Sequence, residues 1–167
     1  MLVGFAGAFR RSELVGLNVE DFEFNDDGLV VHLRRSKTDP EGRGRKVGIP
    51  YGSTPATCPG RAVQAWLAVL KAENGPVLRT IDRHGHIFET RLTPQSVALV
   101  VKRLTAKIGL LGDYAGHSLG AGLATAAAGV PERAIMAQTG HKSLTTLRKY
   151  LREESLFLEN AAAKVGL

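Results

Sequence analysis

The sequence predicts a mainly helical domain with a small three-stranded antiparallel sheet, an α+β fold. Apolar residues recur at helical spacing in segments that begin at Pro59, Thr93 and His117. Between residues 22 and 50, short β-rich runs alternate with turn residues, the pattern of a hairpin and a third strand. The chain has no internal repeat and no dividing linker, so we expect a single domain over residues 1–167.

The composition favours an anionic partner without requiring one. The formal net charge is +6 at pH 7, which suits nucleic acid, although a soluble protein can carry such a charge alone. The single cysteine, Cys58, excludes an intrachain disulfide and suits a reducing compartment. No apolar run approaches the roughly 20 residues of a membrane span. We therefore expect a cytoplasmic protein with no membrane partner.

The first third of the chain predicts one helix followed by three strands. Apolar and small residues at helical spacing predict a helix over residues 2–17. The run FEF, an NDDG turn and the run LVVHLR then predict a β-hairpin, and KVGIP predicts a further strand. The strands are expected at 22–24, 29–34 and 46–50, with a basic loop at 35–46.

The middle of the chain predicts two amphipathic helices. Pro59 opens the first, and Asn74-Gly75-Pro76 stops it. Thr93 is a natural N-cap for the second, and residues 77–92 between the two helices are either a loop or a small strand pair. The residues expected to face inward on the second helix are Val97, Val100, Val101, Leu104 and Ile108.

The last third predicts short helices separated by glycine and proline. They are expected at 117–128, 132–139 and 143–152, with a weaker helix at 155–165. We expect Leu144, Leu147 and Leu151 to form the buried stripe of the third of these helices.

Near the N-terminus, the run GAFRRSEL places Arg10 three residues before Glu13. The planar guanidinium of arginine can bind two phosphate oxygens at once, which lysine cannot reproduce. The alternative is that Arg10 and Arg11 only supply positive charge at the end of an apolar helix.

A lysine follows the predicted hairpin in the run Ser36-Lys37-Thr38. The proton of a lysine is movable, so Lys37 near a phosphate could act as a general acid. The alternative is a solvated basic loop. The neighbouring Arg35 and Arg43 are candidates for contacts to a nucleic-acid backbone.

Two histidines and a tyrosine lie in the last three predicted helices. His117 opens a helix, and Gly120 lies three residues later on the same face, where glycine offers no donor and costs about 1 kcal/mol relative to alanine. His141 lies in the turn between two helices, and Tyr150 follows it by nine residues. Taken singly, these side chains are also typical of a helix cap, an exposed turn and a packing residue.

In order and spacing, these residues resemble the two signature boxes of the tyrosine recombinases, the phage-integrase family of DNA strand-transfer enzymes. In that family an arginine lies three residues before a glutamate, and a lysine lies on a β-hairpin. The second box reads His-x-x-Arg, then Gly-His, then a tyrosine nine residues later. The chain matches this pattern with Gly120 in the place of the second arginine, and the resemblance implies the catalytic-domain fold of that family.

The resemblance implies cleavage and rejoining of DNA through a 3′-phosphotyrosyl intermediate, with no metal and no cofactor, as in DNA recombination and integration by phages and mobile elements. It implies that Tyr150 is the nucleophile, that Lys37 is the general acid and that Glu13 supports the site. The phosphate would be held by Arg10, His117 and His141. The missing arginine at Gly120 implies very low DNA-cleavage activity. An engineered or degenerate loss of that arginine is the simplest account of the glycine.

The resemblance also implies double-stranded DNA as partner and a nucleoid-associated protein of a prokaryote or phage. We expect an N-terminally truncated catalytic domain, because family members carry an N-terminal DNA-binding domain that is absent here. The family's C-terminal helix docks on a neighbouring protomer of a tetramer, although residues 155–165 suit an intrachain helix equally. The residues expected to contact DNA are Arg35, Arg43, Lys102, Arg103 and Lys142.

Two non-catalytic functions compete with this interpretation. Residues 132–151 also fit a helix-turn-helix module that would read bases with Ser143, Thr145, Thr146 and Arg148. That hypothesis gives no role to the spacing of Arg10, Lys37 and His117, so it ranks second. The loss at Gly120 also suits a degenerate recombinase that remains as a DNA-bound regulator.

Overall fold

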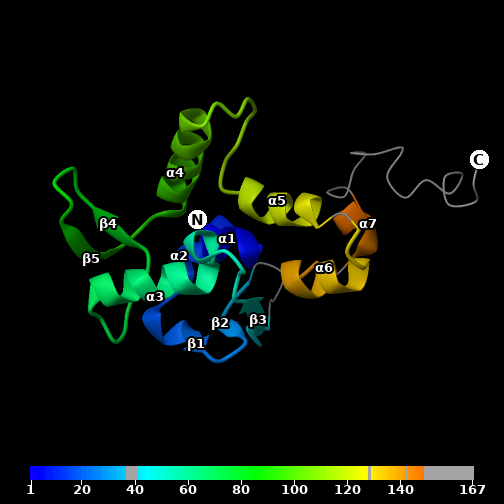
Figure 1. The fold of residues 1–167 in the computed structure, drawn as a ribbon, viewed down its shortest axis with the longest axis horizontal. Helices are drawn as coiled ribbons and strands as arrows, with labels where there is room; N and C mark the ends of the chain where they lie inside the picture. The colour runs from blue at the N-terminus through cyan, green and yellow to red at the C-terminus, as the bar shows by residue number, and fades with distance from the viewer. Residues whose placement is uncertain (37–40, 128, 142, 149–167) are drawn as a thin grey trace, which may run out of the picture.

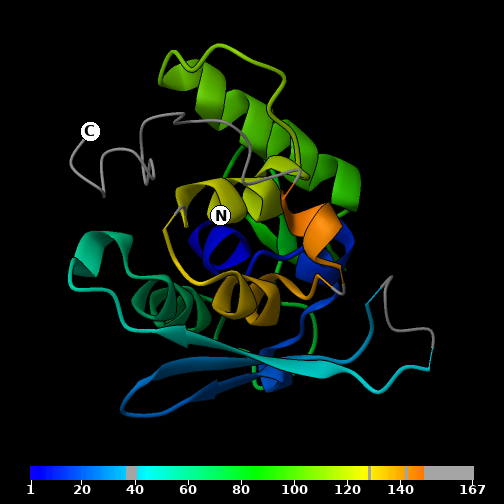
Figure 2. The same ribbon diagram turned by 90° about the vertical axis from the view of Figure 1, so that its right-hand side faces the viewer.

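Helices cover one face of a small antiparallel sheet in the computed structural model, which describes residues 1–36, 41–127, 129–141 and 143–148 (Figures 1 and 2). The first half contains α1 (Leu2–Ala6), α2 (Arg11–Gly16), η1 (Val19–Asp21), β1 (Phe22–Phe24), β2 (Gly28–Leu33), β3 (Arg45–Pro50), η2 (Pro55–Thr57) and α3 (Pro59–Leu70). The second half contains β4 (Arg79–Ile81), β5 (Ile87–Arg91), α4 (Pro94–Lys107), α5 (Ser118–Ala126), α6 (Glu132–Thr139) and α7 (Leu144–Arg148). The predicted α+β fold class is confirmed.

The three-stranded sheet has the order β1-β2-β3, with antiparallel pairing throughout. Val31 on the central strand pairs with Phe22 on one side and Val47 on the other. The turn between the first two strands forms because Asn25 Oδ1 accepts a hydrogen bond from the backbone N–H of Gly28 at 2.9 Å. The predicted hairpin and third strand are therefore confirmed, and β3 begins one residue earlier than expected, at Arg45.

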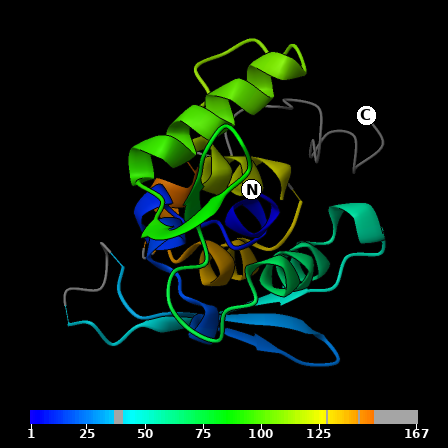
Figure 3. The same ribbon diagram turned by 90° about the vertical axis from the view of Figure 1, so that its left-hand side faces the viewer.

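The main core lies between the sheet and the helices that cover one of its faces. Alternate residues of β2 and β3 turn inward because side chains of a strand point to opposite faces. In Figures 2 and 3 the sheet forms one layer, α1, α3 and α6 lie above it, and α4 lies farthest from it. The buried residues of this core are Phe9, Leu14, Val15, Leu17, Leu29, Val31, Leu33, Val47, Ile49, Val63, Val97, Val101 and Leu119.

The prediction of one continuous helix over residues 2–17 is wrong. The chain turns at Gly7–Phe9, where the N–H of Phe9 bonds to the carbonyl of Gly4 at 2.9 Å and the N–H of Ala8 bonds to Phe5 at 3.0 Å. This pairing closes a helix with a left-handed residue, here Ala8 with φ 51° instead of the usual glycine. The turn allows Arg10 to begin a second helix in a new direction.

Two other predictions of burial are wrong. On α4, Val97 and Val101 are buried, whereas Leu104 is 42% and Ile108 is 72% exposed. The reason is that α4 packs on α2 with its first turns and then projects away from the sheet (Figure 1). On α7, Leu147 is buried against α5 and α6, but Leu144 is 44% exposed.

The segment that the sequence left ambiguous forms a two-stranded hairpin of β4 and β5. The predicted cap of α4 is confirmed, since Thr93 Oγ1 accepts a hydrogen bond from the N–H of Ser96 at 3.1 Å. The predicted helix at 155–165 and the end of the helix at 143–152 lie outside the described residues. Within the described ranges, every helix is too short or too polar to cross a membrane.

The strained turn at Ala8 gives a first testable prediction. Replacing Ala8 by glycine removes the steric cost of the left-handed conformation, and we expect the free energy of unfolding to rise by about 0.5–1 kcal/mol. Urea denaturation measures this change. The matched control is Ala65→Gly, in the exposed middle of α3, which should lower stability by about 1 kcal/mol. A destabilised Ala8→Gly variant would contradict the account of this turn.

Candidate active site

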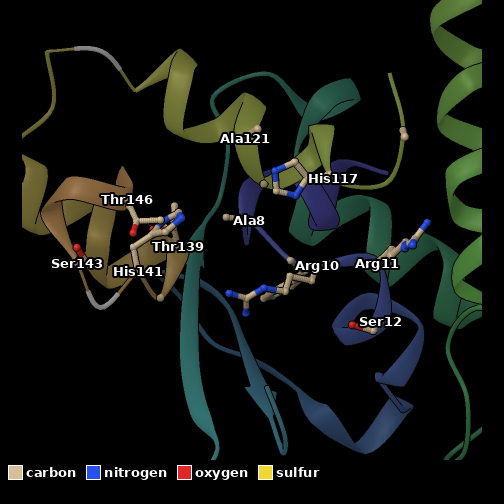
Figure 4. A pocket seen from close by; sticks show the side chains of 14 residues that line it. Ala8, Arg10, Arg11, Ser12, His117, Ala121, Thr139, His141, Ser143 and Thr146 are labelled. Carbon is tan, nitrogen blue, oxygen red and sulfur yellow. The ribbon is translucent and has the colours of Figure 1, made fainter. Parts of the chain in front are cut away.

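The three predicted phosphate-binding residues line one pocket. Its volume is about 570 Å³, and it lies between the start of α2, the first turns of α5 and the α6–α7 turn. Arg10, His117 and His141 surround the same space in Figure 4, and Gly120 lies on its wall. Segments more than 100 residues apart in the sequence therefore meet here, as the two-box pattern predicts.

Arg10 is held by a buried carboxylate. Glu13 accepts from Arg10 twice, from its backbone N–H at 2.9 Å and from its Nη1 at 2.8 Å. The first of these bonds caps the N-terminus of α2, where a carboxylate is also favoured by the helix dipole. The Glu13 side chain is 3% exposed and that of Arg10 is 35% exposed. Glu13 thus fixes the Arg10 guanidinium at the pocket through Nη1, while the Arg10 side chain remains partly accessible.

Ser36 joins the lysine-bearing loop to this pair. Its hydroxyl donates to Glu13 Oε1 at 2.7 Å and accepts from Arg10 Nη1 at 3.0 Å. Since Ser36 directly precedes Lys37, the hairpin loop is held beside Arg10 at the residue before the predicted general acid. Lys37 itself, Tyr150 and Lys142 lie outside the described residues.

The backbone of the Ala8 turn lies against Gly120. A Cβ built at position 120 would lie 3.2 Å from the Ala8 carbonyl oxygen, closer than most side-chain contacts. The sequence shows no local benefit of glycine inside this helix, and the structure supplies one: α5 approaches the turn that precedes Arg10. A larger residue requires a shift of a few tenths of an ångström.

His141 is oriented from the end of α6. Its Nδ1 lies 2.6 Å from Thr139 Oγ1, and that hydroxyl lies 2.8 Å from the carbonyl oxygen of Ile135. Burial lowers the pKa of His141 below its ordinary value, and the nearby charges of Arg10, His117 and Arg45 lower it further.

Two residues that the sequence analysis did not single out fix the end of α6. Arg45 Nη1 on β3 donates to the carbonyl of Gln138 at 3.0 Å. Gln138 Nε2 donates to the carbonyls of Ala6 at 2.7 Å and Gly48 at 3.2 Å. These bonds satisfy carbonyls at the ends of α1 and α6 and tie the histidine-bearing turn to the sheet. No local sequence signal marks them, because Arg45 and Gln138 lie 93 residues apart.

A family comparison agrees with this geometry. Residues 1–155 match the model of the "Phage integrase family". The chain belongs to the phage integrase family. The predicted family and its fold are thus confirmed.

The chain is also similar to a curated relative and to solved structures of recombinases. The chain is 40% identical over 162 residues to an integrase/recombinase xerD homolog of Selenomonas ruminantium, covering 95% of this chain and 48% of the relative. The crystal structure of XerA recombinase superposes with a TM-score of 0.72 at 17% identity, covering 99% of this chain and 54% of that one. The XerH site-specific recombinase bound to palindromic difH substrate, a post-cleavage complex, gives 0.70 at 20% identity, covering 97% and 43%.

The chain spans about half the length of the relatives it matches. Because the identities to the solved structures are low, these structures support the fold alone. The roles of the pocket residues are inferred from the geometry of this chain.

Four of the five predicted DNA contacts of this integrase domain lie among the described residues, and all four are exposed. Arg43 forms an ion pair with Glu41 at 2.6 Å, and Lys102 forms one with Asp113 at 3.3 Å. Arg35 and Arg103 are exposed. DNA would have to compete with the two ion pairs, so the structure leaves these contacts as predictions. In the described part of the chain, no group of three or more His, Cys, Asp or Glu side chains is arranged to hold a metal ion.

The contacts of α6 and α7 do not favour a base-reading helix. Arg148, one of the predicted base readers, makes two bonds to the carboxylate of Glu132, at 2.7 and 3.1 Å. Ser143 and Thr146 line the pocket together with His141. Two of the four proposed base readers thus line the pocket and a third is ion-paired, while base reading by residues 132–151 stays a prediction.

The Glu13 network gives a second prediction. Glu13→Ala leaves a part-buried guanidinium and the Ser36 hydroxyl without their acceptor, and we expect a loss of roughly 2–4 kcal/mol in stability. Glu13→Gln keeps the shape but loses the charge, and should cost roughly half as much. Urea denaturation measures both, with the exposed Glu73→Gln as control. Equal stability of all three variants would show that the network is not structural.

Proposed function

We propose that this chain is the catalytic part of a tyrosine recombinase, which cleaves and rejoins double-stranded DNA through a 3′-phosphotyrosyl intermediate. The observation that carries the proposal is the convergence of Arg10, His117 and His141 on one pocket beside Ser36. Family membership and the spacing of the two boxes support the same chemistry. The XerH relative of known structure is bound to its DNA substrate.

The proposed reaction starts when the Tyr150 hydroxyl gives up its proton to solvent and its oxygen attacks a DNA phosphorus. The bond from phosphorus to the 5′ oxygen breaks, and Lys37 gives that oxygen a proton. A 5′ hydroxyl of a second strand then returns a proton to Lys37 as it attacks the phosphotyrosine, the tyrosine oxygen leaves and takes a proton from solvent, and the DNA is rejoined. The number of phosphodiester bonds is conserved, so neither step needs a nucleotide or another energy source.

In this scheme the pocket stabilises the charge that develops on the phosphate. The guanidinium of Arg10 presents donors to its oxygens, and His117 and His141 approach from the other walls. Because these groups are held by the fold before DNA binds, little reorganisation is needed in the reaction. Glu13 takes no part in the chemistry and acts by positioning Arg10.

Gly120 leaves this pocket without the family's second arginine. Removal of one preorganised donor typically lowers the rate by roughly 10²–10³, and a charged two-pronged donor contributes at least as much. We therefore propose that the chain as it stands cleaves DNA slowly. We also propose a tetramer on DNA in which residues 155–165 dock on a neighbouring copy. A regulator that binds DNA without cutting it is the competing function, which the glycine favours.

The third prediction restores the missing donor. Gly120→Arg places a guanidinium on the pocket wall, and we expect at least a 100-fold rise in covalent protein–DNA adduct on a nicked duplex that traps the intermediate. Gly120→Ala adds the same Cβ beside Ala8 without a donor and should give no rise. Gly120→Arg combined with Tyr150→Phe should give no adduct.

The same assay separates the enzyme from the regulator. It is run on the chain alone and on a chimera in which the chain replaces the matching half of the Selenomonas ruminantium relative. If Gly120→Arg yields no adduct in either form while DNA is still retained on the chimera, the catalytic function is excluded for this chain and the regulator is supported.

A further inference from the structure

The hydrogen bonds around Thr139 restrict where the proton of His141 can lie. Thr139 is buried, and its hydroxyl oxygen lies 2.8 Å from the Ile135 carbonyl oxygen and 2.6 Å from His141 Nδ1. A carbonyl oxygen cannot donate, so the single hydroxyl proton of Thr139 points to Ile135. If it pointed to the imidazole instead, two oxygens would face each other at 2.8 Å with no proton between them.

With its own proton committed, Thr139 Oγ1 can only accept from His141. The proton between them therefore belongs to the imidazole Nδ1. A neutral imidazole carries one proton, so its Nε2 then holds a lone pair. Nε2 is on the far side of the ring from Thr139, and His141 lines the pocket. A neutral His141 thus offers an acceptor at Nε2, which repels the oxygens of a phosphate.

We infer that Thr139 is a positioning residue for the proposed reaction: its hydroxyl holds His141 in the Nδ1–H tautomer, so His141 donates to a phosphate only after Nε2 takes up a second proton. The inference rests on the proposed function for the identity of the anion. The tautomer itself is argued from the contacts of Thr139 with Ile135 and His141.

The charges around His141 determine when its imidazole takes up the second proton. Arg10 from the start of α2, His117 from the start of α5 and Arg45 from β3 act on it, and together with burial they lower its pKa. The neutral form therefore prevails in the empty pocket at neutral pH. The negative charge of a phosphate offsets these positive charges and stabilises the imidazolium form of His141. Binding of the anion and uptake of the proton are thus linked, and each strengthens the other.

The fourth prediction is tested by NMR on the full chain labelled with ¹⁵N at histidine, without DNA. Long-range ¹H–¹⁵N correlations distinguish a protonated from an unprotonated ring nitrogen, and loss of one set in His141→Gln assigns the signals among the five histidines. In the wild-type chain above the pKa of His141, we expect Nδ1 protonated and Nε2 unprotonated. Thr139→Val, which can neither donate nor accept, should shift His141 toward the Nε2–H tautomer, and Thr139→Ser should preserve the wild-type pattern.

Sulfate supplies the anion, since it does not titrate near neutral pH. We expect saturating sulfate, compared with chloride of equal ionic strength, to raise the pKa of His141 in the wild-type chain. The rise should be smaller in Thr139→Val, because its neutral His141 already donates from Nε2. A wild-type His141 protonated on Nε2, or a Thr139→Val variant that retains the Nδ1–H tautomer, would overturn the inference. Neither result depends on DNA cleavage, so the proposed function would stand or fall separately.

Discussion

The site depends on a buried carboxylate that organises three segments at once. Glu13 caps the first turn of α2, holds the guanidinium of Arg10 and accepts from Ser36. A buried charge is tolerated only when it is paired and hydrogen-bonded, so these partners stabilise the folded chain. The same constraint directs Arg10 into the pocket and holds the hairpin loop beside it. Stability and proposed catalysis thus use one set of bonds.

The opposite wall of the pocket is built on the same principle. Near the end of α6, the carbonyl of Gln138 accepts a hydrogen bond from Arg45 on β3, and the Gln138 side chain donates to the carbonyls of Ala6 and Gly48. This pairing fixes the turn that carries His141 relative to Arg10, and Thr139 fixes the orientation of the imidazole. Burial lowers the pKa of His141, and repulsion from the positive charges collected in this way lowers it further. An anion in the pocket relieves that repulsion.

The sequence predicted the sheet because the β-rich runs FEF, LVVHLR and KVGIP are separated by turn residues. The convergence of Arg10, His117 and His141 has no such local signal, and it was predicted from the resemblance to the phage-integrase family. The break at Ala8 was missed because it is an alanine in a left-handed conformation, which no local pattern marks. The exposure of Ile108 and the bond made by Arg45 depend on packing between distant segments. The bonds of Thr139 are local, since Ile135 and His141 lie four and two residues away. Lys37 and Tyr150 lie outside the described residues, so their positions remain predictions.

The central claim is that Arg10, His117 and His141 bind one phosphate together. The most direct test is a crystal structure of the full chain with orthovanadate, which adopts the five-coordinate geometry of phosphoryl transfer. We predict one vanadate in the pocket, within hydrogen-bond distance of the Arg10 guanidinium and of both imidazoles, while Glu13 keeps its bonds to Arg10. Vanadate bound elsewhere, or bound in the pocket without contact to Arg10, would contradict the account.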